Sequence, residues 1–352
     1  MGVHLVDVLA QSESGVPGRS EYVAVQDLRA TAAGTAAATS VDLAKLGVKV
    51  EAFGAVGSDA LGRLLRSLLA DADVGTSLIV EKTRLSTSTS LVIVWPDGDR
   101  SVLYAPGADR RLDESDLSDA HWRAIDTARV LHVGGPDALG RFAGAPLVRL
   151  IERARAHGAI VTADLLQPGA PVTLQRLAPV FTLADWLLIN EQQLRGITGQ
   201  DAFDEAVASL RSITRANLAV TKGGHGCTII TGEESFTLPA LPVAVVDVTG
   251  CGDAFNAGFI LGLLLDRSAL DCGWLATACG ALTATGLGSD AGLIDFDQVV
   301  HFLWPYHPLP SDLQDRAQQL LRPKTRHDVR SPGGCGSPCA GESHSAPQRS
   351  AS

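Results

Sequence analysis

Short apolar segments alternate with longer amphipathic segments through most of this sequence, and this alternation constrains the fold more than any other feature. Continuous apolar strands separated by helices form a parallel sheet with helices on both faces, because both faces of such strands must be buried. The predicted strands are 48–56, 130–133, 159–163, 186–189 and 218–221, and the predicted helices are 60–72, 138–157, 202–213, 254–265 and 269–285. The sequence therefore predicts an α/β fold with a mostly parallel central sheet.

Two β-rich segments, 87–94 and 100–104, break this alternation. They are joined by Trp95-Pro96-Asp97-Gly98-Asp99, in which Pro-Asp-Gly favours a tight turn, so we expect a β-hairpin. The stretch 22–28 is a candidate strand beside the hairpin. A small antiparallel sheet at this place is typical of a lid over a substrate, although a hairpin without a function would have the same pattern.

A glycine-rich turn from Asp247 to Asp253 is the strongest functional signal. The apolar segment 241–246 before it is predicted to be a buried strand, and the predicted helix 254–265 follows it. Free N–H groups at the start of a helix, together with the helix dipole, form an anion site. A carboxylate beside such a site indicates phosphoryl transfer to a hydroxyl. The alternative is a purely structural turn, since glycine-rich turns of this kind are common in α/β proteins.

Charge and composition exclude several classes of partner. The net charge is −10 over 352 residues and no Lys/Arg cluster lies along a predicted helix, which argues against nucleic acid and anionic membranes. The sequence lacks an uncharged apolar run of 18 residues and a signal peptide, so no membrane span is expected. Scattered cysteines favour reduced thiols in a cytoplasmic protein. The Cys335/Cys339 pair lacks a second ligand pair for a metal.

The turn and the helix behind it resemble the C-terminal signature of the PfkB family of ribokinase-like carbohydrate kinases. That signature is D-T-x-G-x-G-D, followed by a helix of small and apolar residues such as Ala254-Phe255-Asn256-Ala257-Gly258-Phe259. In this chain Val248 precedes the threonine, and Cys251 stands where alanine is commoner. The resemblance extends from about Gly2 to about Val300.

The resemblance implies a fold and a domain organisation. We expect a ribokinase-like three-layer sandwich over residues 1–323, with the small β lid at about 12–30 and 77–105. In many family members the lid is also the dimer interface, so a homodimer through the lid is a candidate assembly. Residues 324–352 are rich in Ser, Gly, Pro and Arg, and we expect them to be a disordered tail.

The resemblance also implies that Asp253 is the catalytic base, which accepts the proton of a substrate hydroxyl as that oxygen attacks the γ-phosphate of ATP. The N–H groups of Gly250, Cys251 and Gly252 would stabilise the charge of the transferred group. Beside a helix N-terminus we expect the pKa of Asp253 to be low, which is tolerable because positioning contributes most to phosphoryl transfer. The alternative role for Asp253 is a helix cap.

Asp247 and Thr249 have two interpretations each. The resemblance implies that Asp247 lies near a monovalent cation such as K⁺ or holds the loop, and that Thr249 contributes to the nucleotide site. A local Asx-type hydrogen bond between them is equally compatible with the sequence.

The segment Thr221-Lys222-Gly223-Gly224-His225-Gly226 resembles the T-x-G-x-x-G turn that lines the nucleotide in the family. Thr221, Gly223, Gly224 and Gly226 match this turn, and Lys222 is expected near phosphate. It is not a P-loop, because the spacing G-x-x-x-x-G-K-[ST] is absent from the whole chain. Taken alone, the segment is typical of a tight β-turn.

The segment Asn190-Glu191-Gln192-Gln193 takes the place of the family motif N-x-x-E, which organises Mg²⁺ and phosphate. Asn190 matches, but the final acid is Gln193. A neutral amide cannot replace a carboxylate in holding hydrated Mg²⁺. Either Glu191 substitutes as a metal ligand, or the handling of the metal is weakened.

The segment Ala33-Gly34-Thr35-Ala36-Ala37-Ala38 resembles the sugar-site signature G-G-x-x-x-N, with Gly34 and Thr35 as substrate-binding candidates. The asparagine that reaches a sugar hydroxyl in the family is Ala38 here, which removes hydrogen bonds that a neutral sugar needs. An alanine-rich helix that only packs on the sheet explains the segment equally well. Asp7 stands where the family has an acid for substrate hydroxyls.

Two further features bear on the substrate. No Lys or Arg lies between Thr31 and Leu43, so a phosphate group there would be unpaired and a neutral sugar or nucleoside is favoured. The first strand of the family fold is expected ahead of Gly2, and its absence would leave an open sheet edge or an unfilled central slot.

These observations favour an ATP- and Mg²⁺-dependent kinase that acts on a hydroxyl of a neutral sugar, as a ribokinase or fructokinase does. A nucleoside kinase is the first alternative. A degenerate family member that binds a ligand without turnover is the second, because of Ala38 and Gln193. An oxidoreductase with a dinucleotide fold is disfavoured, since no G-x-G-x-x-G follows an early strand.

Overall fold

The structure is a computed structural model, and it describes residues 1–310 except 12–18, 26, 96–99 and 233. The predicted tail at 324–352 and the predicted turn at 96–99 lie outside the described residues. Within the described part, no helix is both long enough and apolar enough to cross a lipid bilayer.

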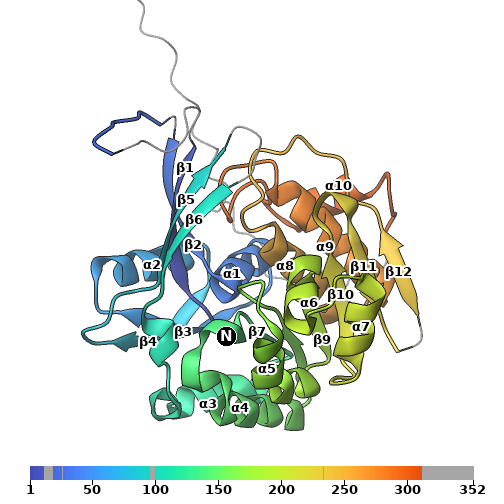
Figure 1. Ribbon diagram of the computed structural model, residues 1–352, viewed down its shortest axis with the longest axis horizontal. Helices are drawn as coiled ribbons and strands as arrows, with labels where there is room; N and C mark the ends of the chain where they lie inside the picture. Colours follow the sequence, from blue (N-terminus) through green and yellow to red (C-terminus); the bar gives the residue numbers. More distant parts are fainter. Residues whose placement is uncertain (12–18, 26, 96–99, 233, 311–352) are drawn as a thin grey trace, which may run out of the picture. The chain divides into compact units, whose positions relative to one another are not determined.

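A six-stranded sheet in the order β12-β11-β10-β9-β8-β7 forms the centre of the fold (Figure 1). Strands β7 to β10 are parallel, and β11 and β12 continue the sheet in antiparallel pairing. The strand bounds are β7 Val130–Val133, β8 Ile160–Ala163, β9 Trp186–Asn190, β10 Asn217–Thr221, β11 Cys227–Ile230 and β12 Ser235–Leu238. The predicted strands 130–133, 159–163, 186–189 and 218–221 are confirmed to within one residue at each end.

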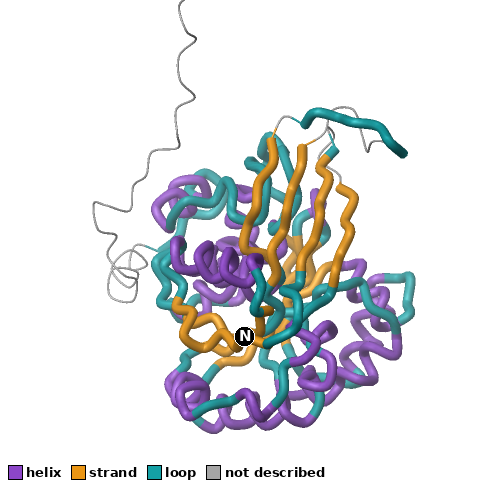
Figure 2. The backbone as a smooth tube through the Cα atoms, turned by 90° about the vertical axis from the view of Figure 1, so that its left-hand side faces the viewer, coloured by secondary structure: helices purple, strands orange, loops and turns teal. Residues whose placement is uncertain are grey.

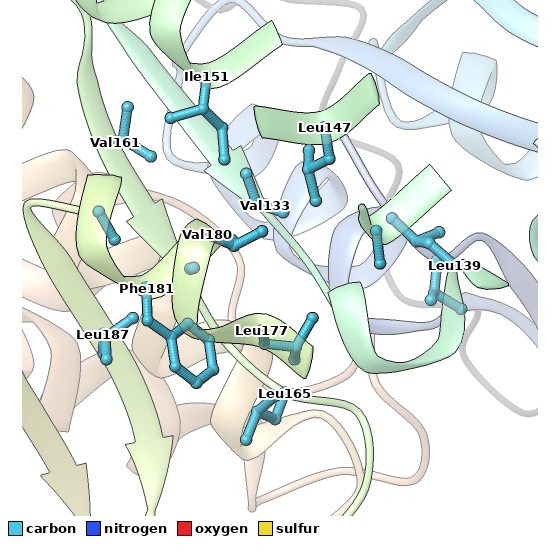
Figure 3. Close-up of a cluster of buried hydrophobic side chains, with 14 of the residues drawn as sticks. Val133, Leu139, Leu147, Ile151, Val161, Leu165, Leu177, Val180, Phe181 and Leu187 are labelled. Carbon is cyan, nitrogen blue, oxygen red and sulfur yellow. The ribbon is translucent and has the colours of Figure 1, made fainter. Parts of the chain in front are cut away.

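Helices cover both faces of this sheet, as apolar strands require. On one face, α4 to α7 share a buried cluster with β7 to β10; on the other, α8 to α10 pack against β9 to β12. Figure 3 shows part of the first cluster, with Leu147, Ile151, Leu177, Val180 and Phe181 of the helices facing Val133, Val161 and Leu187 of the strands. The helix bounds are α1 Thr35–Lys45, α2 Ala60–Asp71, α3 Asp119–Thr127, α4 Ala145–Ala156, α5 Pro171–Leu183, α6 Glu191–Thr198, α7 Phe203–Arg211, α8 Cys251–Leu264, α9 Ala269–Thr283 and α10 Phe296–Leu303. The three-layer α/β architecture predicted from the sequence is confirmed.

Strands β3 (Glu51–Gly57) and β4 (Gly75–Lys82) form a separate parallel pair. Only residues 1–3 lie between β3 and β7: Gly2 N donates to Phe53 O at 2.9 Å, and Val3 N donates to Gly134 O at 3.0 Å. The sheet is therefore interrupted at the position where the resemblance placed a first strand.

The lid is a four-stranded sheet in the order β2-β1-β5-β6, with its strands side by side in Figure 2. Its strands are β1 Leu5–Gln11, β2 Asp27–Ala33, β5 Thr89–Val94 and β6 Arg100–Ala105. The predicted hairpin is confirmed as the antiparallel pair β5–β6. The predicted pairing of 22–28 with the hairpin is wrong, because β2 pairs with β1, and β1 lies between β2 and the hairpin.

Two predicted boundaries near the functional turn are wrong. The segment 241–246 is not a strand: Pro242 has no N–H to donate to a ladder, and Val246 N donates to Ala284 O behind α9 at 2.8 Å. Helix α8 begins at Cys251, three residues before the apolar pattern starts, because its first turn faces a cleft and not the core. In the predicted helix 138–157, the α-helix begins only at Ala145, behind two short 3₁₀ turns.

Candidate active site

A cleft of about 1090 Å³ lies between the lid and the carboxyl ends of β8, β9 and β10. Ligands bind at this edge of parallel sheets, because the loops that follow the strands meet there. The cleft is lined by all but one of the residues that the sequence predicts for the site: Asp7, Gly34, Thr35, Asn190, Glu191, Thr221, Lys222, Gly223, Gly224, Gly226, Thr249, Gly250, Cys251, Gly252 and Asp253. The exception is Asp247, which is fully buried.

The glycine-rich turn leads directly into α8. Gly250 precedes the helix in a left-handed conformation, with φ at 79°, and a Cβ built on it would lie 2.5 Å from the Cα of Ser289. Only glycine fits there without strain. A Cβ on Gly252 would meet nothing within 4 Å, so the chain leaves space in front of the helix. The first N–H groups of α8 have no acceptor within the helix. The N–H of Cys251 donates instead to Val248 O, at 3.4 Å.

Asp253 lies in the first turn of α8 and lines the cleft. It does not cap the helix, because Gly250 takes that position and no side-chain cap is present. The expectation of a low pKa is wrong: burial, followed by repulsion from Asp164, Asp42 and Asp7, raises the pKa of Asp253 well above its usual value. A carboxylate with a raised pKa is a stronger base than an ordinary one.

Asp164 and Asn256 are site residues that the sequence reasoning missed. Asp164 follows β8 and is 3% exposed; its Oδ1 accepts from Gly135 N and its Oδ2 from Asn256 Nδ2, both at 2.7 Å. Both residues line a small cavity of about 70 Å³ beside Asp253. The available signal was an acid placed directly after a predicted parallel strand.

Asp247 holds the turn from behind. Its Oδ1 accepts from Thr249 N at 2.9 Å and from Thr249 Oγ1 at 2.8 Å, and its Oδ2 accepts from Gly288 N at 2.9 Å. The Asx-type hydrogen bond considered as an alternative is therefore present. It joins the turn to the loop behind α9, so the carboxylate contributes to the shape of the site without lining it.

The predicted nucleotide turn follows β10 as a short 3₁₀ turn, Gly223–His225. Gly226 has φ at 84°, and a Cβ there would lie 2.0 Å from Leu238 O. Gly223 and Gly224 would tolerate a Cβ, because nothing lies within 4 Å of it. The Nζ of Lys222 lies 3.7 Å from the centroid of the Phe203 ring, so this ammonium makes a cation–π contact at the cleft wall.

Asn190 and Gln193 form a capping box at the start of α6. Asn190 Oδ1 accepts from Gln193 N at 2.8 Å, and Gln193 Oε1 accepts from Asn190 N at 2.9 Å. The Gln193 amide also donates to Leu165 O at 2.7 Å, a bond that a carboxylate could not make. Glu191 pairs with Arg195 at 2.8 Å. No group of three His, Cys, Asp or Glu residues in the described chain could hold a metal ion alone.

One wall of the cleft, where the sequence predicts substrate-binding residues, combines α1 with the lid. Asp7 lies beside Ser90 of β5, and burial raises the pKa of Asp7 to about 6. Ala38 is 1% exposed on the packed side of α1, so nothing at that position reaches the cleft. The Thr35 hydroxyl is buried beside the cleft and has no hydrogen-bond partner among the described residues.

Arg100 of β6 is a third residue that the sequence reasoning missed. Its Nη1 donates to Thr249 Oγ1 at 3.1 Å, across the cleft from the lid to the glycine-rich turn. Residues 31–43 include no Lys or Arg, but Arg100 of the lid lines the same cleft. Its position directly behind the hairpin turn was the only available signal.

This chain is similar to known carbohydrate kinases in sequence and to solved ribokinase structures in fold. The profile of the pfkB family carbohydrate kinases matches residues 4–295. Fructokinase-1 of Oryza sativa is 28% identical over 271 residues, which are 73% of this chain and 83% of that protein. Probable chloroplastic fructokinase-6 of Arabidopsis thaliana is 30% identical over 272 residues, 73% of this chain and 70% of that one. A putative ribokinase II of E. coli, solved with ATP and Mg²⁺, has a TM-score of 0.73 at 19% identity and covers 87% of this chain and 98% of its own.

Proposed function

The chain belongs to the pfkB family of carbohydrate kinases, and on that premise we propose that it transfers the γ-phosphate of ATP to a hydroxyl of a neutral sugar. The observation that carries the proposal is the placement of Asp253 in the first turn of α8, at the wall of a cleft that is large enough for two substrates. Phosphoryl transfer depends mainly on positioning and on charge stabilisation, and this arrangement supplies both.

In the proposed reaction, the substrate hydroxyl lies against Asp253 and gives up its proton to that carboxylate. The hydroxyl oxygen forms a bond to the γ-phosphorus while the bond from that phosphorus to the leaving ADP oxygen breaks. The N–H groups of Gly250, Cys251 and Gly252 are proposed to bind the oxygens of the phosphoryl group in flight. The raised pKa of Asp253 suits its role as base.

We propose that the nucleotide carries Mg²⁺ into this cleft. The Asp164 carboxylate and the Asn190 amide border the small cavity beside Asp253, and such oxygens fit an ion that keeps several waters and shares phosphate oxygens. When bound, Mg²⁺ neutralises charge on the transferred phosphate. Glu191 is a second candidate ligand, and it would have to leave Arg195. For K⁺, the fit of Asp247 is poorer, because this residue is fully buried and does not line the cleft, and no step is assigned to the ion.

Two observations favour a sugar as the acceptor over a nucleoside. Curated relatives named above are fructokinases. A nucleoside base would need an aromatic ring to stack on, and of Tyr22, Trp95 and Tyr104 in the lid, only Tyr104 lines the cleft. The Thr35 hydroxyl, which is next to the acceptor side and lacks a partner, is proposed to compensate for the missing amide at Ala38. A cytoplasmic location remains a proposal from the sequence.

A substrate panel tests the proposal. The protein is incubated with Mg-ATP and D-fructose, D-ribose, other hexoses, adenosine and related nucleosides, and ADP release is measured. We expect turnover with at least one sugar. Asp253→Asn should lower kcat at least about 1000-fold and leave the Kd for ATP within about threefold. Asp297→Asn in the first turn of α10, on the surface, is the matched control. A folded protein that binds ATP but turns over no acceptor would instead support the ligand-binding alternative.

A further inference from the structure

Three of the four lid strands join the core at one buried polar junction. His4 directly precedes β1, Ser88 directly precedes β5, and Gly107 lies just behind β6; we call these three residues the lid roots. Gly107 N donates to Ser88 Oγ at 2.9 Å, and His4 N donates to Asp109 Oδ1 at 3.3 Å. Asp109 lies in the 3₁₀ turn that follows Gly107, and it is fully buried. Its carboxyl therefore joins the start of β1 to the segment behind β6.

The lid roots are close in sequence to the lid side chains that line the cleft. Asp7 lies on β1 just beyond His4, and Ser90 lies on β5 just beyond Ser88. In the register of the lid sheet, Ser90 is paired with Asp7 on one side and with Tyr104 of β6 on the other. All three residues of this row line the cleft. A movement at the lid roots therefore moves the row, because hydrogen-bonded strands move together.

Asp109 is held at this junction without a cation. Within the described residues, its Oδ2 has no hydrogen-bond partner, and no Lys or Arg forms an ion pair with it. Burial raises the pKa of Asp109 to about 7, although contacts with Ser88 and with the backbone of His4 and Ala55 act in the opposite direction. The carboxyl is therefore neutral in acidic solution and becomes a buried, unpaired charge in alkaline solution.

The titratable side chains at this junction are those of His4 and Tyr104. Burial lowers the pKa of His4 to about 4, so this ring is neutral and offers Asp109 no positive charge. Burial and the negative charge of Asp109 raise the pKa of Tyr104, so the hydroxyl of that residue is also neutral. The charged residues of the turn itself and of the elements packed against it are exposed or paired: Arg110, Glu51 of β3, Glu81 of β4 and Arg141 behind β7 are exposed, and Lys82 of β4 pairs with Asp116.

We propose that Asp109 is a positioning residue for the acceptor: its neutral carboxyl keeps the lid roots together and so holds Asp7 and Tyr104 against the acceptor, whereas its carboxylate loosens the junction. This proposal rests on the proposed kinase function. A buried carboxylate without a cation favours any movement that lets water reach it, and opening of the lid at its base is such a movement. Asp109 does not line the cleft, so it acts on acceptor binding and not on the transfer step.

The direction of the pH dependence follows from the raised pKa. When the lid is open and water reaches the carboxyl, Asp109 ionises near its ordinary value of 3.8, and when the lid is closed it ionises near 7. Ionisation therefore opposes closure increasingly above about pH 4 and to a constant extent above about pH 7. We expect this effect to raise the KM for the acceptor at least about tenfold between pH 5 and pH 7.

Asp109→Asn in the full-length protein tests the proposal, because an amide has the shape of the neutral carboxyl and cannot ionise. The ratio of the acceptor KM of the wild type to that of Asp109→Asn should rise at least about tenfold between pH 5 and pH 7 and stay constant to about pH 8.5. Taking the ratio removes the titration of Asp7, which both proteins share. The kcat and the KM for ATP should agree within about threefold. Asp119→Asn, an exposed change in α3, is the control and should give a constant ratio.

Hydrogen exchange separates this inference from the proposed function, because it needs no acceptor and remains decisive if no member of the substrate panel is turned over. At pH 8 the amides of 3–6 and 107–110 should exchange at least about tenfold faster in the wild type than in Asp109→Asn, and at pH 5 at equal rates. The amides of α4 should exchange equally in both proteins. A KM ratio that is constant from pH 5 to pH 8.5, equal exchange at pH 8, or an equal change in the KM for ATP would overturn the proposal.

Discussion

Two fully buried aspartates in and near the site, Asp247 and Asp42, differ in their hydrogen-bond partners and therefore in their effect on the protein. Asp247 is fully buried and accepts three hydrogen bonds, so its charge is compensated by the chain. Asp42 is also fully buried, but neither of its oxygens has a hydrogen-bond partner within the described residues. The Nζ of Lys45 lies 3.7 Å away and donates to Asp290 O instead. Burial therefore dominates and raises the pKa of Asp42 to about 7.

Because the Asp42 carboxylate is buried without a hydrogen-bond partner among the described residues, we predict that Asp42→Ala stabilises the protein. The folded-state pKa of Asp42 lies above the unfolded value, so its ionisation opposes folding above pH 4 and the cost levels off above about pH 7. We expect the free energy of unfolding of Asp42→Ala to rise by about 2–4 kcal/mol at pH 8, and the gain to vanish as the pH falls toward 4. Urea titrations at pH 5 and pH 8 measure it, with exposed Asp71→Ala as control. A loss of stability at pH 8 would mean that the pair with Lys45 outweighs burial.

Gln193 is the departure from the family motif with the clearest structural consequence. Its amide oxygen accepts from Asn190 N, and its amide nitrogen donates to Leu165 O, so both ends are used in a buried place. Restoring the expected acid with Gln193→Glu should lower the free energy of unfolding by about 1–3 kcal/mol without Mg²⁺, because a carboxylate would face a carbonyl oxygen. Thermal denaturation with the exposed neighbour variant Gln192→Glu as control checks this. Equal melting temperatures would show that the Gln193–Leu165 bond contributes nothing.

At the scale of elements, the start of α8 is decided by one contact that the local sequence does not contain. The apolar periodicity begins at Ala254, but the helix begins at Cys251 because Gly250 turns the chain against Ser289. Similarly, the apolar segment 241–246 satisfies the sequence criterion for a buried strand, yet Val246 donates to the end of α9. Apolar periodicity indicates which side chains are buried. Both segments are adjacent to a cleft, where the pattern of buried side chains no longer follows the secondary structure of the backbone.

Two glycines of this turn should respond in opposite ways to alanine. Gly250→Ala places a methyl 2.5 Å from Ser289 at a φ of 79°, and should lower the free energy of unfolding by about 2 kcal/mol or more. Gly252→Ala meets nothing within 4 Å and should stabilise the helix by up to about 1 kcal/mol, while its methyl occupies the proposed phosphate space and lowers kcat. Chemical denaturation together with Mg-ATP kinetics tests the pair. Equal stabilities would contradict the role given to Ser289.

At the scale of the whole molecule, the lid sheet has two faces with different tasks. The register places Asp7, Ser90 and Tyr104 in one row on the cleft side. The row on the other side includes Val8, Leu91 and Leu103, and the last two are 41% and 69% exposed. Leu28, 63% exposed, lies two positions away on the same side. An apolar sheet face of this kind is typical of a protein interface.

We therefore keep the expectation of a homodimer through the lid as a prediction. Leu103→Lys, on the exposed face of the edge strand β6, should convert a dimer to a monomer in light scattering after size exclusion, because an unpaired charge would be buried at the contact. Val172→Lys, which changes an equally exposed residue of α5, should have no effect on mass. A wild-type protein that is monomeric at micromolar concentration, or a Leu103→Lys variant that remains dimeric, would rule out this interface.

Most of the site could be predicted because most of the predicted residues follow a strand or open a helix at the same sheet edge. Asp7, which lies inside the lid strand β1, is an exception. Asn190, Thr221 and Asp253 meet there through the parallel order of β9 and β10 and the start of α8. Asp164 obeys the same rule and was missed, although a systematic survey of strand ends would have found it. Arg100 obeys no such rule, because a hairpin residue reaches the site only through the placement of the lid.

The sequence by itself determined the α/β class, the order of the central strands along the chain and the turn at Asp253, since these follow from local periodicity and from glycine chemistry. Only the tertiary structure decided three features: the raised pKa of Asp253, the burial of Ala38 away from the cleft, and the hydrogen bond from Arg100 to Thr249. The physical reason is that burial and Coulomb interactions depend on contacts between residues far apart in the chain, such as Arg100 and Thr249, which are 149 positions apart, and no local pattern encodes such contacts.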